Sequence, residues 1–210
     1  MSSTFERRHA ELLRLGGFQP RQFSAGSPFT PDSQHEALIL VGRGRMLVTV
    51  VDPSGREELC ALRGVDSLLG FESIDGTSPH YSLWALTELE LWLAPRSAAD
   101  ALVENLSSLQ SFAALAARAY RRQLGERLMM SRPATARLSH FLLTAEQEPP
   151  VPGMATPAPI GLPRRVMARV LAMRPETLSR ALRRLEADGA IDASADIRIL
   201  DRERLKAASQ

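Results

Sequence analysis

Cysteine and lysine are almost absent from this chain of 210 residues, which has one of each, Cys60 and Lys206. A single cysteine excludes an intrachain disulfide framework, a four-cysteine zinc site and an iron–sulfur cluster ligated by cysteines of one chain. No stretch approaches 18 uncharged apolar residues, so no transmembrane helix is predicted. Residues 1–10 are charged and lack an apolar segment, so we predict no signal peptide and expect a cytoplasmic protein.

The composition is that of a globular protein with 44% hydrophobic and 24% charged residues, large enough for one large domain or two small ones. Charge is divided unevenly along the chain. Residues 1–117 contain nine arginines and fourteen acidic residues, whereas residues 118–210 contain seventeen basic and ten acidic residues. A basic half favours a polyanionic partner. Since all but one of the cations are arginines, phosphate and base contacts would be made mainly by guanidinium groups.

Short apolar, β-branched runs separated by turn residues occupy most of the first hundred residues. They predict strands at 38–41, 46–51, 57–62, 81–87 and 89–93. Strands this short and regularly spaced favour an antiparallel barrel or sandwich. A helix is expected before them, at residues 6–15.

Trp84 and Trp92 lie on the apolar strands and are expected in the core. Cys60 is also expected to be buried and inert, the alternative being a redox-active thiol.

A helical pattern extends from Ser97 to Met130, broken by no proline and by one glycine, Gly125. It predicts one long helix, or a short helix followed by a long one. About 24 residues from Ser107 would span roughly 36 Å, more than a small β-domain needs. Its stripe of small residues favours close pairing with a second helix, and a purely intrachain packing role is the alternative. The predicted dimer interface consists of Leu109, Phe112, Ala116, Ala119 and Leu124.

After Pro133 a further helix is predicted at 134–146, and residues 148–161, with five prolines, read as a linker. Two short helical patterns then follow, at 164–171 and from Pro175 onwards. The apolar stripe of the second pattern contains Leu178, Ala181, Leu182 and Leu185, and its opposite face contains Ser179, Arg180, Arg183 and Arg184. Gly189 suits the C-terminal cap. Two short helices joined by a tight turn predict a helix-turn-helix.

The chemistry of this segment suits a DNA major groove, which admits one α-helix. Between residues 164 and 186 there are seven arginines and two glutamates. Arginine pairs with guanine O6 and N7, and glutamate accepts from cytosine N4. Arg164, Arg165 and Arg169 on the first helix could contact phosphates. The alternative is a solvated charged face on an ordinary helical hairpin.

The tail predicts two short strands, at 190–191 and 197–200, and a last helix from Asp201. The run from Pro175 to Leu182, the segment Asp188–Ile191 and the tail resemble the winged helix-turn-helix of the CRP/FNR family of bacterial transcription regulators. The front half is similar to that family's cyclic-nucleotide-binding-type β-roll at residues 38–44, 68–71 and 85–88, followed by Pro95 and Arg96. The long helix matches the family's dimerisation helix.

This resemblance implies an α+β fold: an N-terminal antiparallel, jelly-roll-like β-roll, a long dimerisation helix and a C-terminal winged helix-turn-helix. The three parts are placed at 1–106, 107–132 and 133–210. It also implies a homodimer on an inverted repeat of double-stranded DNA with a TGA-like half-site core, and RNA polymerase as a partner.

The resemblance further assigns roles to individual residues. Glu176, Ser179 and Arg180 would contact bases, with Arg180 on guanine and Glu176 on a cytosine of the complementary strand. Backbone or auxiliary contacts are assigned to Arg164, Arg165, Arg169, Arg174, Thr177, Arg183 and Arg184. Two positions depart from the family pattern. Arg174 stands where a capping Ser or Thr is common, which removes a helix cap but adds a potential DNA contact. Ala172 replaces the glycine usual in the turn, so we expect a slightly different turn geometry.

No effector-binding residue is predicted. Relatives that bind cyclic AMP use an arginine on the phosphate, but no arginine occurs between Arg63 and Arg96, so cyclic AMP in that mode is not expected. Haem stays open through His80, His35 or His9, each of which is expected to be a surface or hydrogen-bonded residue instead. Another small molecule, such as a cyclic dinucleotide, and the absence of any ligand both stay open. No metal site is predicted.

The sequence therefore predicts a homodimeric, sequence-specific transcription regulator that an effector could gate. One alternative is a ligand-binding regulatory module whose helical tail contacts protein rather than DNA. An enzyme is not expected, since the sequence contains no H-x-H pair, no G-x-S-x-G elbow and no P-loop.

Overall fold

The computed structural model describes residues 4–32, 35–51, 57–71, 81–146, 162–194 and 197–209. The chain divides into two compact units, Met1–Arg122 and Gln123–Gln210. The boundary between them lies inside helix α3 (Leu106–Met130). Within the described ranges, no helix is long and apolar enough to cross a membrane. The predicted linker at 148–161 lies outside the described residues.

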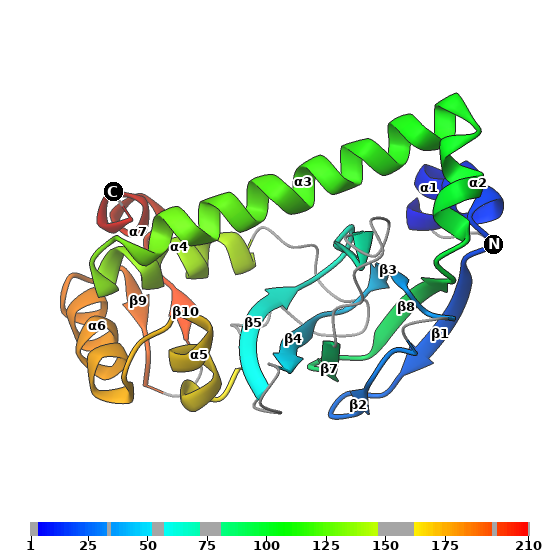
Figure 1. The fold of residues 1–210 in the computed structure, drawn as a ribbon. Coiled ribbons are helices and arrows are strands. Elements are labelled where there is room, and N and C mark those ends of the chain that lie inside the picture. Colours follow the sequence, from blue (N-terminus) through cyan, green and yellow to red (C-terminus); the bar gives the residue numbers. More distant parts are fainter. Residues whose placement is uncertain are drawn as a thin grey trace. The chain divides into compact units, whose positions relative to one another are not determined.

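The first unit contains two antiparallel four-stranded sheets (Figure 1). One has the strand order β1-β8-β3-β6 and the other β2-β7-β4-β5. The first sheet consists of β1 (Gln19–Phe23), β8 (Leu89–Ala94), β3 (Leu38–Arg43) and β6 (Leu68–Leu69). The second consists of β2 (Pro28–Phe29), β7 (Tyr81–Ala85), β4 (Met46–Val51) and β5 (Glu57–Arg63). The predicted antiparallel β-roll is confirmed.

Strand β3 shows how the core is built, because both of its faces are buried. Successive side chains of a strand point to opposite faces. Ile39 and Val41 pack with residues of both sheets, including Met46 and Leu83, and form the core between the sheets. Leu38 and Leu40 point to the other face of their sheet, where three helices cover it. This double burial explains why residues 38–41 are an uninterrupted apolar run.

The helices on that outer face are α1 (Thr4–Leu15), α2 (Ala98–Val103) and the first part of α3. Leu12 of α1, Leu102 of α2 and Phe112 of α3 lie in one cluster with the sheet residues and are 1%, 0% and 7% exposed. The alternative of a short helix followed by a long one is therefore the one observed. Phe112, one of the predicted interface residues, packs in the core of its own unit, which leaves little of its side chain open to a second protomer.

The other four predicted interface residues differ in exposure. Leu109, Ala116 and Ala119 are half-buried, and Leu124 is 44% exposed. Further apolar side chains on α3 are exposed, among them Tyr120 at 59% and Leu128 at 64%. The dimer interface stays a prediction, and the outward apolar face of α3 is the part of the helix that suits it.

The tryptophan prediction is wrong at Trp84, which is 48% exposed. On β7 the alternation of side chains sends Leu83 and Ala85 into the core between the sheets, so Trp84 must lie on the outer face. Trp92 is half-buried against the core beneath the helices, and its indole nitrogen donates to Glu90 at 3.0 Å.

The second unit contains α4 (Ala134–Glu146), α5 (Arg164–Val170), α6 (Pro175–Ala187) and α7 (Arg202–Ala208). A two-stranded ribbon of β9 (Ile191–Asp192) and β10 (Arg198–Ile199) lies between α6 and α7 in the sequence (Figure 1). The predicted apolar stripe of α6 is buried, from Leu178 at 1% to Leu185 at 0% exposure. Gly189 follows the helix with φ of +67°, which confirms its capping role.

Candidate nucleic-acid interface

The turn between α5 and α6 determines how the two helices are arranged. Ala172 occupies the left-handed region with φ of +48°. The amide of Met173 then donates back to the carbonyl of Ala168 at 2.8 Å and closes α5. The departure from glycine therefore leaves an alanine in the left-handed region, and the expected difference in turn geometry stays a prediction. Alanine adopts this conformation at a cost of about 1–2 kcal/mol.

A side chain from α4 holds the same turn. The guanidinium Nη1 of Arg137 donates to the carbonyl oxygen of Leu171 at 3.0 Å and to that of Ala172 at 3.4 Å. Carbonyl groups at a helix C-terminus lack intrahelical partners, and a cation there is also favoured by the helix dipole. Arg137 was not predicted, because nothing in the residue pattern of α4 indicates which distant carbonyl a side chain reaches.

Helix α6 begins without a side-chain cap, as the sequence predicts. Its N-cap residue is Arg174, whose side chain makes no capping hydrogen bond, and Pro175 occupies the first turn. Glu176 is the acidic residue of that turn, where the positive end of the helix dipole favours a carboxylate. The exposed N-terminal turn of α6 thus contains one cation and one anion side by side.

The predicted base-reading residues lie on the side of α6 opposite to its buried stripe. Glu176 and Arg180 are exposed, and within the described part of the chain neither makes a hydrogen bond or ion pair. Ser179 is half-buried, and its hydroxyl donates to the carbonyl of Pro175 at 2.9 Å. Since the hydroxyl proton of Ser179 is engaged, its oxygen is left to accept, as from an adenine or cytosine amino group.

The arginines assigned to the DNA backbone fall into two groups. Arg165, Arg169, Arg174 and Arg184 are exposed, and their side chains have no partner among the described residues. Arg183 is also exposed, and only its Nε makes a long contact, 3.4 Å, with the carbonyl of Ser179. Arg164 differs, because its Nη2 donates to the carbonyl of Ala193 at 2.8 Å. Thr177 is half-buried.

The segment after α6 is held by several local hydrogen bonds. The backbone amide and the hydroxyl of Ser194 both donate to the Asp192 carboxylate, at 2.9 and 2.7 Å. These two bonds, with a smaller contribution from the charge of Arg198, hold the pKa of Asp192 below its ordinary value. The carboxylate of Asp201 caps α7 by accepting from the amides of Glu203 and Arg204.

Comparison with known proteins adds two findings. Residues 136–208 match a family model described as the Crp-like helix-turn-helix domain. FixK2 from Bradyrhizobium japonicum has a similar structure, with a TM-score of 0.71, 23% identity, and 92% of this chain and 98% of that chain covered. Residues 136–208 therefore belong to the Crp-like helix-turn-helix family, and the chain shares the fold of FixK2. This match spans α4 to α7 of the second unit, so these helices form a Crp-like helix-turn-helix domain.

Two more solved structures share the fold of this chain. A CRP family transcriptional regulator from Thermus thermophilus is 21% identical, with a TM-score of 0.69 and coverage of 90% of this chain and 96% of that one. The c-di-GMP-responsive global regulator CLP of Xanthomonas campestris is 21% identical, with a TM-score of 0.59 and coverage of 91% and 98%. No curated protein is significantly similar to the chain in sequence.

The first unit contains the residues considered for an effector. His9 is 7% exposed, and its Nε2 lies 2.9 Å from Asp66 Oδ1, while exposed His35 contacts Asp32 at 3.0 Å. His80 and the side chain of Cys60 lie outside the described residues. Where the chain is described, no three His, Cys, Asp or Glu side chains form a group that could hold a metal ion.

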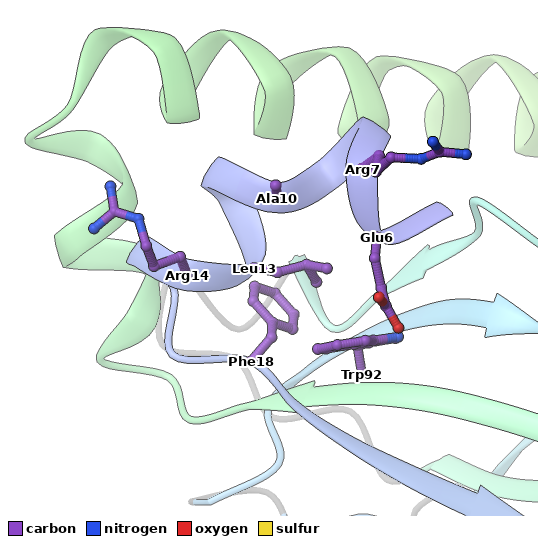
Figure 2. Close-up of a pocket in the computed structure, with 7 residues that line it drawn as sticks. All are labelled: Glu6, Arg7, Ala10, Leu13, Arg14, Phe18 and Trp92. Atoms are coloured by element: carbon purple, nitrogen blue, oxygen red, sulfur yellow. The ribbon is translucent and has the colours of Figure 1, made fainter. Parts of the chain in front are cut away.

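A shallow hollow of about 310 Å³ lies between α1 and β8 (Figure 2). Ala10 leaves space in its wall, and Trp92 forms part of its base. Leu13 and Phe18 also line it but are only 6% and 4% exposed, so they offer little apolar surface to a ligand. Figure 2 shows the guanidinium groups of Arg7 and Arg14 directed away from the hollow.

Proposed function

We propose that the protein is a CRP/FNR-type transcription regulator that binds DNA as a homodimer at an inverted repeat, with α6 of each protomer in a major groove. The observation that carries the proposal is the position of Arg180. It is exposed on the face of α6 opposite Leu178 and Leu185, and within the described ranges it has no protein partner. An exposed, unpaired guanidinium on the second helix of a helix-turn-helix is available to a guanine edge.

The neighbouring side chains suit a half-site with a TGA-like core. Arg180 would donate two parallel hydrogen bonds to guanine O6 and N7, and Glu176 would accept from a cytosine amino group on the complementary strand. Phosphate contacts from the unpaired arginines of α5 and from Arg174 would set the register of α6 in the groove. Affinity is therefore expected to fall with salt, because each neutralised phosphate releases counterions.

The outward face of α3 supports the homodimer. Tyr120, Leu124 and Leu128 follow one another at four-residue steps and are 59%, 44% and 64% exposed. Pairing of α3 with a second copy would remove this apolar surface from water. The paired helices would hold two α6 helices about 34 Å apart, one turn of DNA. An effector that gates binding would act by changing this arrangement of the two α6 helices.

The test is selection of binding sites by the ligand-free, purified chain from randomised duplex DNA at fixed moderate salt. We expect enrichment of an inverted repeat whose half-sites are centred about one helical turn apart. Enrichment of single half-sites would contradict the homodimer. The selection is then repeated with cyclic mono- and dinucleotides, which would reveal DNA binding that requires an effector. If nothing is enriched in any of these selections, the DNA-reading role is wrong.

A further inference from the structure

Ala193, which directly follows β9, is held by charged side chains from two different helices. Arg164 of α5 donates to its carbonyl oxygen at 2.8 Å, and Glu186 of α6 accepts from its amide at 3.1 Å. Ala193 is only 5% exposed. If the two side chains were removed, water could therefore hydrogen-bond to its amide and carbonyl only poorly, and the lost bonds would be costly. Each bond involves an ionised side chain, which makes it stronger than one between neutral groups.

The strands beside Ala193 are too short to fix their own position. β9 and β10 pair at two positions only, Asp192 with Arg198 and Ile191 with Ile199. Such a ribbon is marginal by itself and needs support from the rest of the unit. Buried Ile191 and Ile197 anchor it, at 1% and 8% exposure. The Arg164 and Glu186 bonds add directional support, beside the backbone bonds from Leu200 and Asp201 to the carbonyl oxygen of Ala190.

We propose that Arg164 and Glu186 act as a clamp that positions the β9–β10 wing against α6 for DNA binding. Arg164 is then a positioning residue rather than a phosphate contact. This inference rests on the proposed DNA-binding function. The exposed wing side chains whose position the clamp fixes are Ser194 and Arg198.

Electrostatics and the clamp predict opposite effects at Glu186. Removing a negative charge from a DNA-binding surface should strengthen binding, because it reduces repulsion of the phosphates. Removing the acceptor that holds Ala193 should weaken binding, because the wing loses its fixed position. Glu186→Ala makes both changes. Glu186→Gln removes the charge but keeps an oxygen that can accept from the amide.

The experiment measures the dissociation constant of the full chain on its selected inverted repeat and on an unrelated duplex, over a range of salt. We expect Glu186→Ala to weaken specific binding about tenfold, as expected for one hydrogen bond to a charged group. Glu186→Gln should bind at least as tightly as the wild type. Arg164→Ala should weaken specific binding about tenfold, while the dependence of the logarithm of affinity on the logarithm of salt concentration keeps its slope.

Arg165→Ala is the matched control, since Arg165 is exposed on the same helix and has no partner in the described part of the chain. Its salt slope should fall by about 0.9 for one lost phosphate contact. The clamp is overturned if Glu186→Ala binds as tightly as the wild type, or if Arg164→Ala lowers the slope as Arg165→Ala does. It is also overturned if Arg164→Ala and Glu186→Ala both lower the Tm of the protein but leave its dissociation constant for the inverted repeat unchanged. Equal affinity of the wild type for both duplexes would contradict the proposed function instead.

Discussion

Arg137 of α4 donates a hydrogen bond of 3.0 Å to the carbonyl oxygen of Leu171, at the turn between α5 and α6. The bond ties α4 to the point at which the chain changes direction before α6. The next residue, Ala172, is left-handed with φ of +48°. The orientation of α6 thus depends on a turn in which one residue is strained and a neighbouring carbonyl is held by a side chain from another helix.

The strain at Ala172 predicts that Ala172→Gly stabilises the protein. Glycine adopts positive φ without the clash that alanine suffers, although it loses more chain entropy on folding. The difference should raise the free energy of unfolding by about 0.5–1 kcal/mol. Urea denaturation of the two proteins, followed by circular dichroism, measures it.

Ala114→Gly is the control for this substitution, because Ala114 is an exposed residue in the interior of α3. There the same replacement should destabilise by about 0.5–1 kcal/mol, since glycine is unfavourable in the middle of a helix. If Ala172→Gly lowers stability as Ala114→Gly does, the left-handed turn is not the strained element that its φ indicates.

The helices of the second unit could be predicted from the sequence to within one or two residues. Their apolar residues recur at helical spacing, and Pro133, Pro175 and Gly189 mark boundaries by local backbone chemistry. The support for the turn and the wing could not be predicted. Arg137 and Arg164 reach carbonyl groups 34 and 29 positions away in the sequence, and no local pattern encodes such a contact.

In the first unit, the sequence predicts β3, β4, β5, β7 and β8, but not β1 or the two-residue strands β2 and β6. β1, with the sequence QPRQF, is exposed over most of its length and reads as a loop. It pairs with β8 only because the fold places an edge strand there. Trp84 was misplaced for a related reason: aromatic character indicates a strand but does not tell which of its two faces is buried.

Asp66 predicts a specific pH dependence of stability. The hydrogen bond from His9, helped by the charges of His9 and Arg8 and opposed by burial, holds the pKa of Asp66 below its ordinary value of 3.8. A depressed carboxyl pKa contributes stability that is complete above the unfolded-state value and is lost as the pH falls through the folded-state value. The contribution of Asp66 is therefore expected to disappear on acidification below pH 3.8.

Asp66→Asn tests this pH dependence. Asp66 has φ of +63°, a conformation that asparagine also adopts readily, so the substitution leaves the backbone undisturbed. Between about pH 5 and pH 2, the free energy of unfolding should fall less for the variant than for the wild type. The two free-energy curves, obtained from urea titrations at each pH, would run parallel if the ionised carboxylate of Asp66 contributed nothing.

The outward face of α3 predicts the oligomeric state. The wild-type chain should sediment as a dimer, and Leu124→Glu should weaken its association at least about tenfold, because a charge would be buried in an apolar interface. Gln123→Glu adds the same charge at the adjacent exposed residue and should leave the dimer intact. Sedimentation equilibrium distinguishes the three proteins. A monomeric wild type, or a Leu124→Glu variant as dimeric as the control, would contradict this use of α3.

The most direct measurement is the base preference of Arg180→Ala. The wild type and the variant would each be titrated with the selected inverted repeat and with a duplex in which the half-site guanine is replaced. The wild type should prefer guanine by about 1–3 kcal/mol, and Arg180→Ala should bind both duplexes equally, since the side chain that distinguishes them is gone. If Arg180→Ala keeps the full preference for guanine, α6 does not read DNA through Arg180 and the account of this helix is wrong.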